Sequence, residues 1–138
     1  MRIAMIGAGY VGLVSGACFS DFGHHVSCID SDEKKVTALN SGEMPIHEPG
    51  LADLVASNVK HGRLTFGSDM KSAVGNAEVV FIAVGTPSRR GDGHADLSYV
   101  FAAAEQVARA LTSYAVIVTK STVPVGTSRR IEIGRAHV

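Results

Sequence analysis

Three glycines near the start of the chain, Gly7, Gly9 and Gly12, constrain its fold more than any other feature. They follow a short apolar run typical of a strand, residues 3–6, and precede residues 13–22, which are compatible with a helix. In the spacing G-x-G-x-x-G, the first glycine permits a tight turn, the second lets the backbone approach a phosphate, and the third lets helix and strand pack closely. The pattern therefore predicts a strand, a turn and a helix whose N-terminus binds an anion.

An acidic residue follows the glycine turn at about the distance expected for a dinucleotide-binding site. The apolar run 25–29 predicts a second strand, and Asp30 at its end lies eighteen residues after Gly12. A carboxylate there accepts hydrogen bonds from the adenosine ribose of NAD and repels the additional phosphate of NADP, so we expect a dinucleotide site that prefers NAD. Lys35 leaves an alternative open, because its cation can tolerate that phosphate or pair with Asp30 or with nearby acidic residues.

The rest of the chain alternates strand and helix patterns without an internal repeat. This predicts an α/β fold with a doubly wound parallel sheet of the Rossmann type. Strands are expected at Arg2–Ile6, His25–Ile29, Leu64–Phe66, Val79–Val84 and Val116–Thr119. Helices are expected at Asp32–Asn40, Leu51–Val59 and Leu97–Leu111, the last with Asp96 as N-cap, and a further helix starts at Thr127–Ile133. Because a sixth strand is missing, we expect a sheet that is truncated at its C-terminal end.

Length and composition set further limits. The 138 residues, of which 46% are hydrophobic, suit one ordered domain, which we place at residues 1–133 and follow with a non-native tail at 134–138. Thirteen basic and thirteen acidic residues cancel, so neither nucleic acid nor a membrane is an expected partner. Cys18 and Cys28 fit small buried apolar residues in a reducing cytoplasm, and the histidines lack the spacing of metal ligands.

Hydroxyl and turn residues follow the fourth and fifth expected strands. Gly85, Thr86 and Pro87 follow the fourth strand, and Ser121 and Thr122 follow the fifth. Because the ends of parallel strands meet at one edge of a sheet, we expect all five residues near the glycine turn. The alternative is that they form plain structural turns, which use the same residue types.

Two loops are longer than a simple connection requires, Ser41–Gly50 and Gly85–Ala95. Long loops beyond strand ends often carry ligand contacts. The second loop can be either a mobile flap or a solvated connection, and its region carries charged side chains at Arg89, Arg90, Asp92 and Asp96. In the first loop, His47 and Glu48 form a conceivable acid–base pair, although we favour packing or loop shaping for His47.

Five motifs in order resemble the N-terminal domain of the UDP-glucose 6-dehydrogenase family over almost the whole chain up to Ile133. They are GAGYVGL at 7–13, GEMPIHEPGL at 42–51, VGTP at 84–87, ADLSYV at 95–100 and KSTVPVGT at 120–127. The resemblance implies that the intact enzyme, a cytoplasmic homo-oligomer, oxidises the C6 alcohol of UDP-glucose to a carboxylate with two NAD⁺. GDP-mannose or a UDP-N-acetylhexosamine are alternative substrates, and a non-catalytic dinucleotide-sensing module is an alternative of another class.

The resemblance also implies roles for individual residues. The expected cofactor contacts are Gly7, Gly9, Tyr10, Val11, Gly12, Asp30, Lys35, Gly85, Thr86, Pro87, Ser121 and Thr122. Thr122 would lie near the nicotinamide and help to position the catalytic water or the substrate oxygen. The nucleophilic thiol of the family, with its lysine and aspartate partners, belongs to segments that these 138 residues do not include. We therefore expect weak or partial cofactor binding and no turnover.

Overall fold

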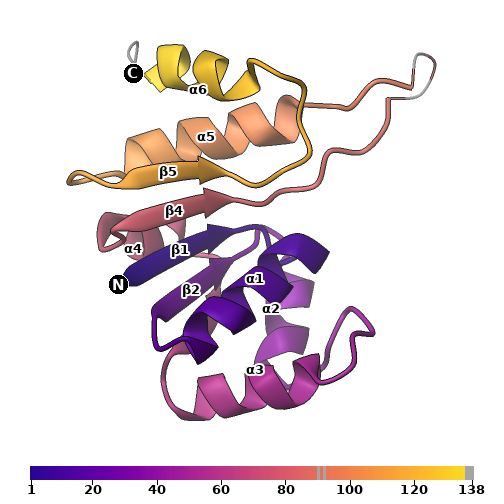
Figure 1. The fold of residues 1–138 in the computed structure, drawn as a ribbon, viewed down its shortest axis with the longest axis vertical. Coiled ribbons are helices and arrows are strands. Elements are labelled where there is room, and N and C mark those ends of the chain that lie inside the picture. Colours follow the sequence, from indigo (N-terminus) through magenta and orange to yellow (C-terminus); the bar gives the residue numbers. More distant parts are fainter. Residues whose placement is uncertain (90, 92, 136–138) are drawn as a thin grey trace.

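Strands and helices alternate along the chain as the apolar patterns predict. The computed structural model describes residues 1–89, 91 and 93–135. Its elements, labelled in Figure 1, are β1 (Arg2–Ile6), α1 (Tyr10–Asp21), β2 (His25–Ile29), α2 (Glu33–Asn40), α3 (Leu51–Lys60), β3 (Leu64–Gly67), α4 (Met70–Gly75), β4 (Val79–Ile82), α5 (Ser98–Ala110), β5 (Val116–Thr119) and α6 (Thr127–Arg135). The predicted bounds of β1, β2 and β5 are confirmed.

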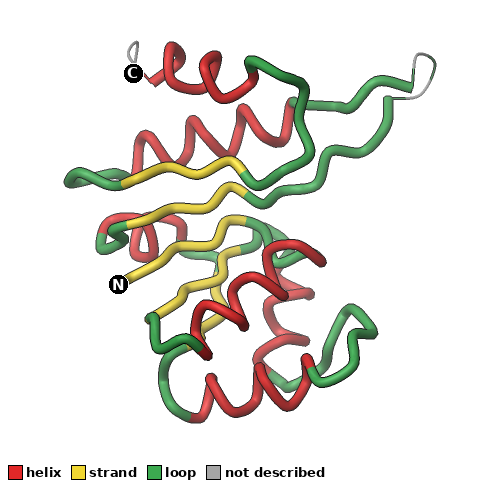
Figure 2. Tube along the Cα trace, viewed as in Figure 1, coloured by secondary structure: helices red, strands yellow, loops and turns green. Residues whose placement is uncertain are grey.

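One sheet with the strand order β3-β2-β1-β4-β5 forms the centre of the molecule, and all its strand pairs are parallel. The strands run side by side through the middle of Figure 2, with helices on both sides. In β1, Ile3 lies in register with Val26 of β2 and with Val79 of β4. This order confirms the doubly wound Rossmann-type sheet.

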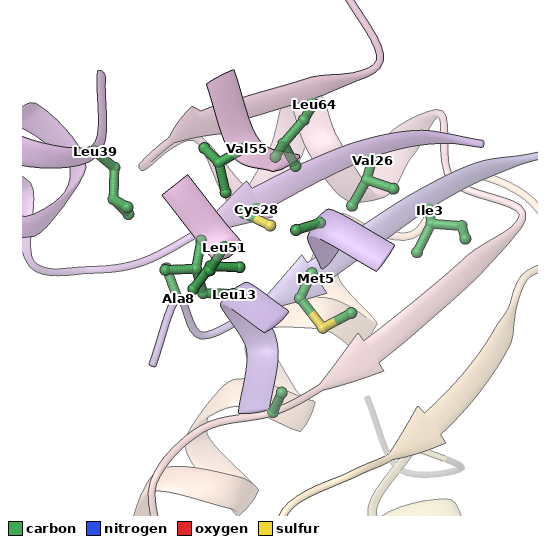
Figure 3. Close-up of a cluster of buried hydrophobic side chains, with 12 residues drawn as sticks. Ile3, Met5, Ala8, Leu13, Val26, Cys28, Leu39, Leu51, Val55 and Leu64 are labelled. Atoms are coloured by element: carbon green, nitrogen blue, oxygen red, sulfur yellow. The ribbon is translucent and has the colours of Figure 1, made fainter. Parts of the chain in front are cut away.

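Two hydrophobic cores flank the sheet, and β1 contributes to both because successive strand residues point to opposite faces. Ile3 and Met5 lie in the first core, which α1, α2 and α3 cover and Figure 3 shows in close-up. Ala4 and Ile6 lie in the second core, which α4 and α5 cover and against which α6 packs. The helices before β3 therefore lie on one face of the sheet, and the helices after β3 lie on the other. Because all strands are parallel, each strand ends at the same edge of the sheet.

The first core contains an especially close fit between α1 and β2. A Cβ atom added to Gly16 would lie 2.6 Å from Sγ of Cys28. Burial raises the pKa of the Cys28 thiol to about 12, so this cysteine behaves as a small apolar residue, as predicted. Cys18 is free as well but only half-buried, so the prediction of a buried residue is wrong for it.

The structure corrects several predicted boundaries. The six-residue helix α4 was not predicted, because a single turn and a half is too short to show a helical period. β4 ends at Ile82 rather than Val84, since its partner β5 stops at the paired Thr119. α1 begins at Tyr10, three residues before the apolar period becomes visible at Leu13.

The start of α5 also differs from the prediction. The N-cap position is Leu97 and not Asp96, and the helix ends at Ala110. The carboxylate of Asp96 nevertheless accepts a hydrogen bond from the N–H of Ser98 at 3.0 Å, which lowers the pKa of Asp96. The predicted N-cap is therefore wrong, although the Asp96 side chain does bond to the first N–H of the helix from the position before the N-cap. Of the predicted tail at 134–138, residues 136–138 lie outside the described residues.

Candidate functional site

A cleft of about 450 Å³ opens at the edge where the parallel strands end. Strand ends of β1, β2 and β4 form its floor, and α5 forms a wall. Half of the predicted contact residues line it, namely Gly7, Gly9, Asp30, Lys35, Gly85 and Pro87. The sequence prediction therefore converges on one site, since these residues come from three separate strand ends.

The glycine turn is built as its spacing predicts. Gly7 has a φ of 102°, and a Cβ there would lie 2.7 Å from the carbonyl oxygen of Ala83. A Cβ on Gly12 would lie 1.8 Å from the carbonyl oxygen of Gly7, so only glycine lets α1 start this close to β1. Gly9 differs, because a Cβ added there would meet nothing within 4 Å. The middle glycine therefore borders open space.

That space adjoins the N-terminus of α1. The first N–H groups of a helix have no intrahelical acceptor, and in α1 they belong to Tyr10, Val11 and Gly12. The N-cap residue, Gly9, provides no side-chain hydrogen bond, and the first turn contains no acidic residue. The positive end of the helix dipole therefore has main-chain donors that suit an anion.

Asp30 is held in place by three hydrogen bonds. Its Oδ2 accepts from the N–H of Ala8 and from Nζ of Lys35, both at 2.9 Å, and its Oδ1 accepts from the N–H of Asp32 at 3.0 Å. Burial by itself raises the pKa of Asp30, but the hydrogen bonds from Lys35, Asp32 and Ala8 and the charge of Lys35 outweigh it and leave the pKa below its usual value. Asp30 is therefore an ionised carboxylate at neutral pH.

The carboxylate keeps capacity for a ligand. Two carboxylate oxygens together offer about four acceptor sites, and the three bonds above occupy three of them. The remaining acceptor site is on Oδ1 and can accept a hydrogen bond from a hydroxyl group of a ligand. Lys35 pairs with Asp30, one of the alternatives that the sequence left open, and 30% of its side chain stays exposed.

Further cleft residues were missed by the sequence reasoning. Those that come from α4 and α5 are Met70, Tyr99, Ala102, Ala103 and Gln106. The four from α5 follow the spacing i, i+3, i+4, i+7, which places them on one helix face. This second stripe beside the core stripe of α5 was the signal that could have identified them.

The hydroxyl residues after β4 and β5, Thr86, Ser121 and Thr122, do not line this cleft, although the two chain neighbours of Thr86, Gly85 and Pro87, do. The Ser121 hydroxyl donates a 2.7 Å hydrogen bond to the carbonyl oxygen of Val84, so it ties the two strand-end loops together. Thr86 is half-buried and Thr122 is exposed. Ser121 thus has a structural role, whereas the Thr122 side chain is accessible to a ligand.

The loop between β4 and α5 is a short antiparallel arm. Ser88 and Ala95 form an antiparallel bridge, and the N–H of Arg89 donates to the carbonyl oxygen of His94 at 2.7 Å. Figure 1 shows the arm projecting beyond the strand ends. Two of the charged residues predicted for it, Arg90 and Asp92, lie outside the described residues.

The loop of residues 41–50 reaches the glycine turn through Glu48. The Tyr10 hydroxyl donates a 2.9 Å hydrogen bond to Oε2 of Glu48, and this bond and the charge of Glu48 raise the pKa of Tyr10. His47 is exposed, so packing does not account for it. Glu48 therefore contacts Tyr10, a pairing that the sequence did not suggest.

In the described part of the chain, no three His, Cys, Asp or Glu side chains come together in an arrangement that could hold a metal ion. No helix within residues 1–89, 91 and 93–135 is both long and apolar enough to cross a membrane.

Comparison with known proteins identifies related sequences. The model of the UDP-glucose/GDP-mannose dehydrogenase family, NAD binding domain, matches residues 1–137. A UDP-glucose 6-dehydrogenase of Rhizobium meliloti is 67% identical over 132 residues, which are 96% of this chain and 30% of that protein. UDP-glucose 6-dehydrogenase TuaD of Bacillus subtilis is 53% identical over 131 residues, which are 95% of this chain and 28% of that protein. The chain thus spans less than a third of the length of these relatives.

Solved structures share the fold. A GDP-mannose dehydrogenase from Pseudomonas aeruginosa, solved as a ternary complex, matches with a TM-score of 0.92 at 38% identity, over 98% of this chain and 31% of that one. A UDP-glucose dehydrogenase from Pyrobaculum islandicum matches with a TM-score of 0.88 at 38% identity, over 99% of this chain and 33% of that one.

Proposed function

Because the chain belongs to the UDP-glucose/GDP-mannose dehydrogenase family and matches its NAD binding domain, we propose that the cleft at the strand ends binds NAD. The observation that carries this proposal is Asp30, an ionised carboxylate fixed beside the glycine turn by Ala8 and Lys35 with one acceptor site to spare. That site accepts a hydroxyl of the adenosine ribose. The main-chain donors of Tyr10, Val11 and Gly12 hold the pyrophosphate.

The residues present fit the cofactor. A Cβ at Gly9 would meet open space, so the backbone leaves room for a phosphate beside the start of α1. The α5 wall supplies an apolar surface from Tyr99, Ala102 and Ala103, with Gln106 as a polar group. A flat, partly polar base suits such a surface, so we assign the adenine to it.

We further propose that NAD is preferred over NADP. Lys35 is already paired with Asp30, so its ammonium group is not available to bind the additional phosphate of NADP. Asp30 repels that phosphate directly. Gly85, Thr86 and Pro87 then contact the cofactor where β4 ends, and Thr122 lies near its nicotinamide.

For the longer protein that the relatives represent, we propose the oxidation of a nucleotide sugar, with UDP-glucose as the substrate. The 67% identity to a UDP-glucose 6-dehydrogenase supports this choice over GDP-mannose. NAD⁺, when bound, supplies the oxidising power by accepting a hydride. The exposed Thr122 hydroxyl positions a water molecule or a substrate oxygen, which is an orienting role and not nucleophilic attack.

We also propose a cytoplasmic protein that forms a homo-oligomer when intact and binds neither nucleic acid nor a membrane. The free cysteines fit a reducing compartment. The balance of thirteen basic and thirteen acidic residues fits the absence of polyanionic partners.

Calorimetric titration of the 138-residue chain with NAD and with NADP tests the cofactor proposal. We expect NAD to bind at least about tenfold more tightly, the effect of one charged hydrogen bond gained and one repulsion avoided. Equal affinities would remove the role of Asp30, and no binding of either would refute the site. A parallel incubation with NAD and UDP-glucose should yield no NADH, and measurable turnover would contradict the expectation that further segments supply the chemistry.

A further inference from the structure

The hydrogen bond between Tyr10 and Glu48 connects the start of α1 to a loop 38 residues away. Tyr10 is the first residue of the helix, so its own N–H is one of the donors assigned to the pyrophosphate. Its side chain is 55% exposed, and its ring is therefore free to move unless something holds its hydroxyl. Glu48 provides that restraint.

Glu48 is itself well anchored. Its carbonyl oxygen accepts a 3.1 Å hydrogen bond from the N–H of Leu51, which begins α3 and is buried in the first core. Two other residues of the same loop, Met44 and Ile46, pack against that core. The loop therefore presents the Glu48 carboxylate to Tyr10 from a backbone that the core fixes in place.

The first turn of α1 has particular need of such a contact. Ser, Thr, Asp and Asn are favoured at the N-cap because their side chains bond to first-turn N–H groups, whereas α1 has Gly9 there without a side-chain hydrogen bond. This glycine leaves room for a phosphate, but it leaves the first turn without a cap. The bond from the Tyr10 side chain to Glu48 leaves the first-turn N–H groups available to a ligand, and it ties the first turn to the loop from outside the helix.

We propose that the Tyr10–Glu48 hydrogen bond positions the first turn of α1 for the phosphates of the dinucleotide. This inference rests on the NAD site proposed above. Tyr10 contributes through its main chain, and Glu48 is a positioning residue that acts through Tyr10. The role concerns the phosphates alone, because Asp30 and the α5 wall hold the adenosine without help from Glu48.

Ligand fragments separate this role from a general structural one. Calorimetry with ADP reports on the phosphates, and calorimetry with adenosine reports on the remainder of the site. For Tyr10→Phe and for Glu48→Ala we expect ADP to bind about threefold more weakly, as the loss of one exposed hydrogen bond implies, with unchanged affinity for adenosine. The double variant should be no worse than either single one, because both remove the same bond.

Two control variants sharpen the test. Glu48→Gln keeps an oxygen that can accept from Tyr10, so ADP affinity should remain that of the wild type. Tyr114→Phe removes a hydroxyl from a tyrosine that is 86% exposed and does not line the cleft, so it should change neither affinity. Circular dichroism verifies that each variant keeps its helices.

Several outcomes would overturn the proposal. Unchanged ADP affinity in both single variants would show that the bond does not matter, and increased affinity would show that the Glu48 charge acts by repulsion. An equal loss for ADP and adenosine would indicate a merely structural contact. If the wild type binds ADP and adenosine while the variants behave identically to it, this inference fails and the NAD site stands, whereas a wild type that binds neither refutes both.

Discussion

The edge of the sheet where the strands end has two unlike halves. Around Asp30, a carboxylate, a cation and two main-chain N–H groups hold one another within 3.0 Å, and the Asp30 side chain is only 11% exposed. In the loop after β5, Ser121 is bonded to the Val84 carbonyl oxygen, but the Thr122 side chain is exposed and Val125 is fully exposed. In the first half, the chain's own hydrogen bonds fix the side chain that would contact a ligand, whereas in the second half the candidate ligand contact, Thr122, is exposed to solvent.

The difference indicates where binding energy should lie. A ligand that meets a preorganised site loses little affinity to ordering, whereas a ligand that meets exposed side chains must order them. We therefore expect the Asp30 half to determine cofactor affinity and the Thr122 half to affect it little. Substitutions in each half test whether affinity depends on the two halves so unequally.

The largest effect is expected at Gly12. In Gly12→Ala, the new Cβ would meet the Gly7 carbonyl oxygen at 1.8 Å, which the backbone cannot relieve without moving α1. Overpacking of this kind should lower the free energy of unfolding by about 3 kcal/mol, and NAD binding should be lost with the turn. Urea denaturation and calorimetry measure the two effects.

Gly9→Ala is the matched control, since its Cβ meets nothing within 4 Å. We expect a loss of less than about 1 kcal/mol in stability, typical of a change at an N-cap, while NAD affinity falls because the methyl enters the space for the phosphates. If Gly9→Ala binds NAD normally, the phosphates do not lie beside this glycine.

Asp30→Asn should give the next largest effect. It removes the charged acceptor for the ribose and leaves Lys35 without its partner. NAD affinity should fall roughly ten- to hundredfold, and the preference over NADP should disappear. Asp32→Asn, which keeps an oxygen that can cap α2 and lies outside the cleft, should change neither. A retained preference for NAD in Asp30→Asn would refute the assigned role of this carboxylate.

The pH dependence of binding should follow Asp30. The pKa of Asp30 is lowered in the folded protein, so the carboxylate stays ionised at any pH above that lowered pKa. The stability that the ionised carboxylate contributes is therefore lost only as the pH falls through the folded-state pKa of Asp30. NAD affinity should thus stay constant from about pH 8 to pH 5 and decline below about pH 4. Asp30→Asn should remove this dependence, and a decline in the wild type between pH 7 and pH 5 would point to another group.

The smallest effects are expected in the other half. Ser121→Ala deprives the Val84 carbonyl oxygen of its donor and should cost about 1 kcal/mol of stability. Thr122→Val should leave stability unchanged and alter NAD affinity by less than about threefold, because the side chain is exposed. A large loss of affinity in Thr122→Val would contradict the difference between the two halves.

Much of the fold could be predicted because its signals are local. The bounds of β1 and β2 were correct, since each is a short apolar run limited by turn residues. The glycine turn and Asp30 were placed correctly because both follow directly from strand ends. α4 escaped prediction because its six residues are too few for a helical period.

The candidate site was less predictable where contacts depend on how elements pack. The bond between Tyr10 and Glu48 joins residues that only the crossover through α2 brings together. Tyr99 and Gln106 look like ordinary surface residues until α5 is docked on the sheet. Ser121 has the residue type of a ligand contact, yet its hydroxyl is bonded to Val84. Residue type alone therefore does not distinguish a side chain that lines the cleft from one that has a structural role.

The close fit between Gly16 and Cys28 has a consequence for how this domain can change over evolutionary time. The two residues share one small volume, since a methyl group at position 16 would lie 2.6 Å from the sulfur atom. A larger residue at position 16 is therefore tolerated only with a smaller one at position 28, and a larger residue at position 28 requires that position 16 stay glycine. Among descendants of such a sequence, positions 16 and 28 should vary as a pair, although one lies on a helix and the other on a strand.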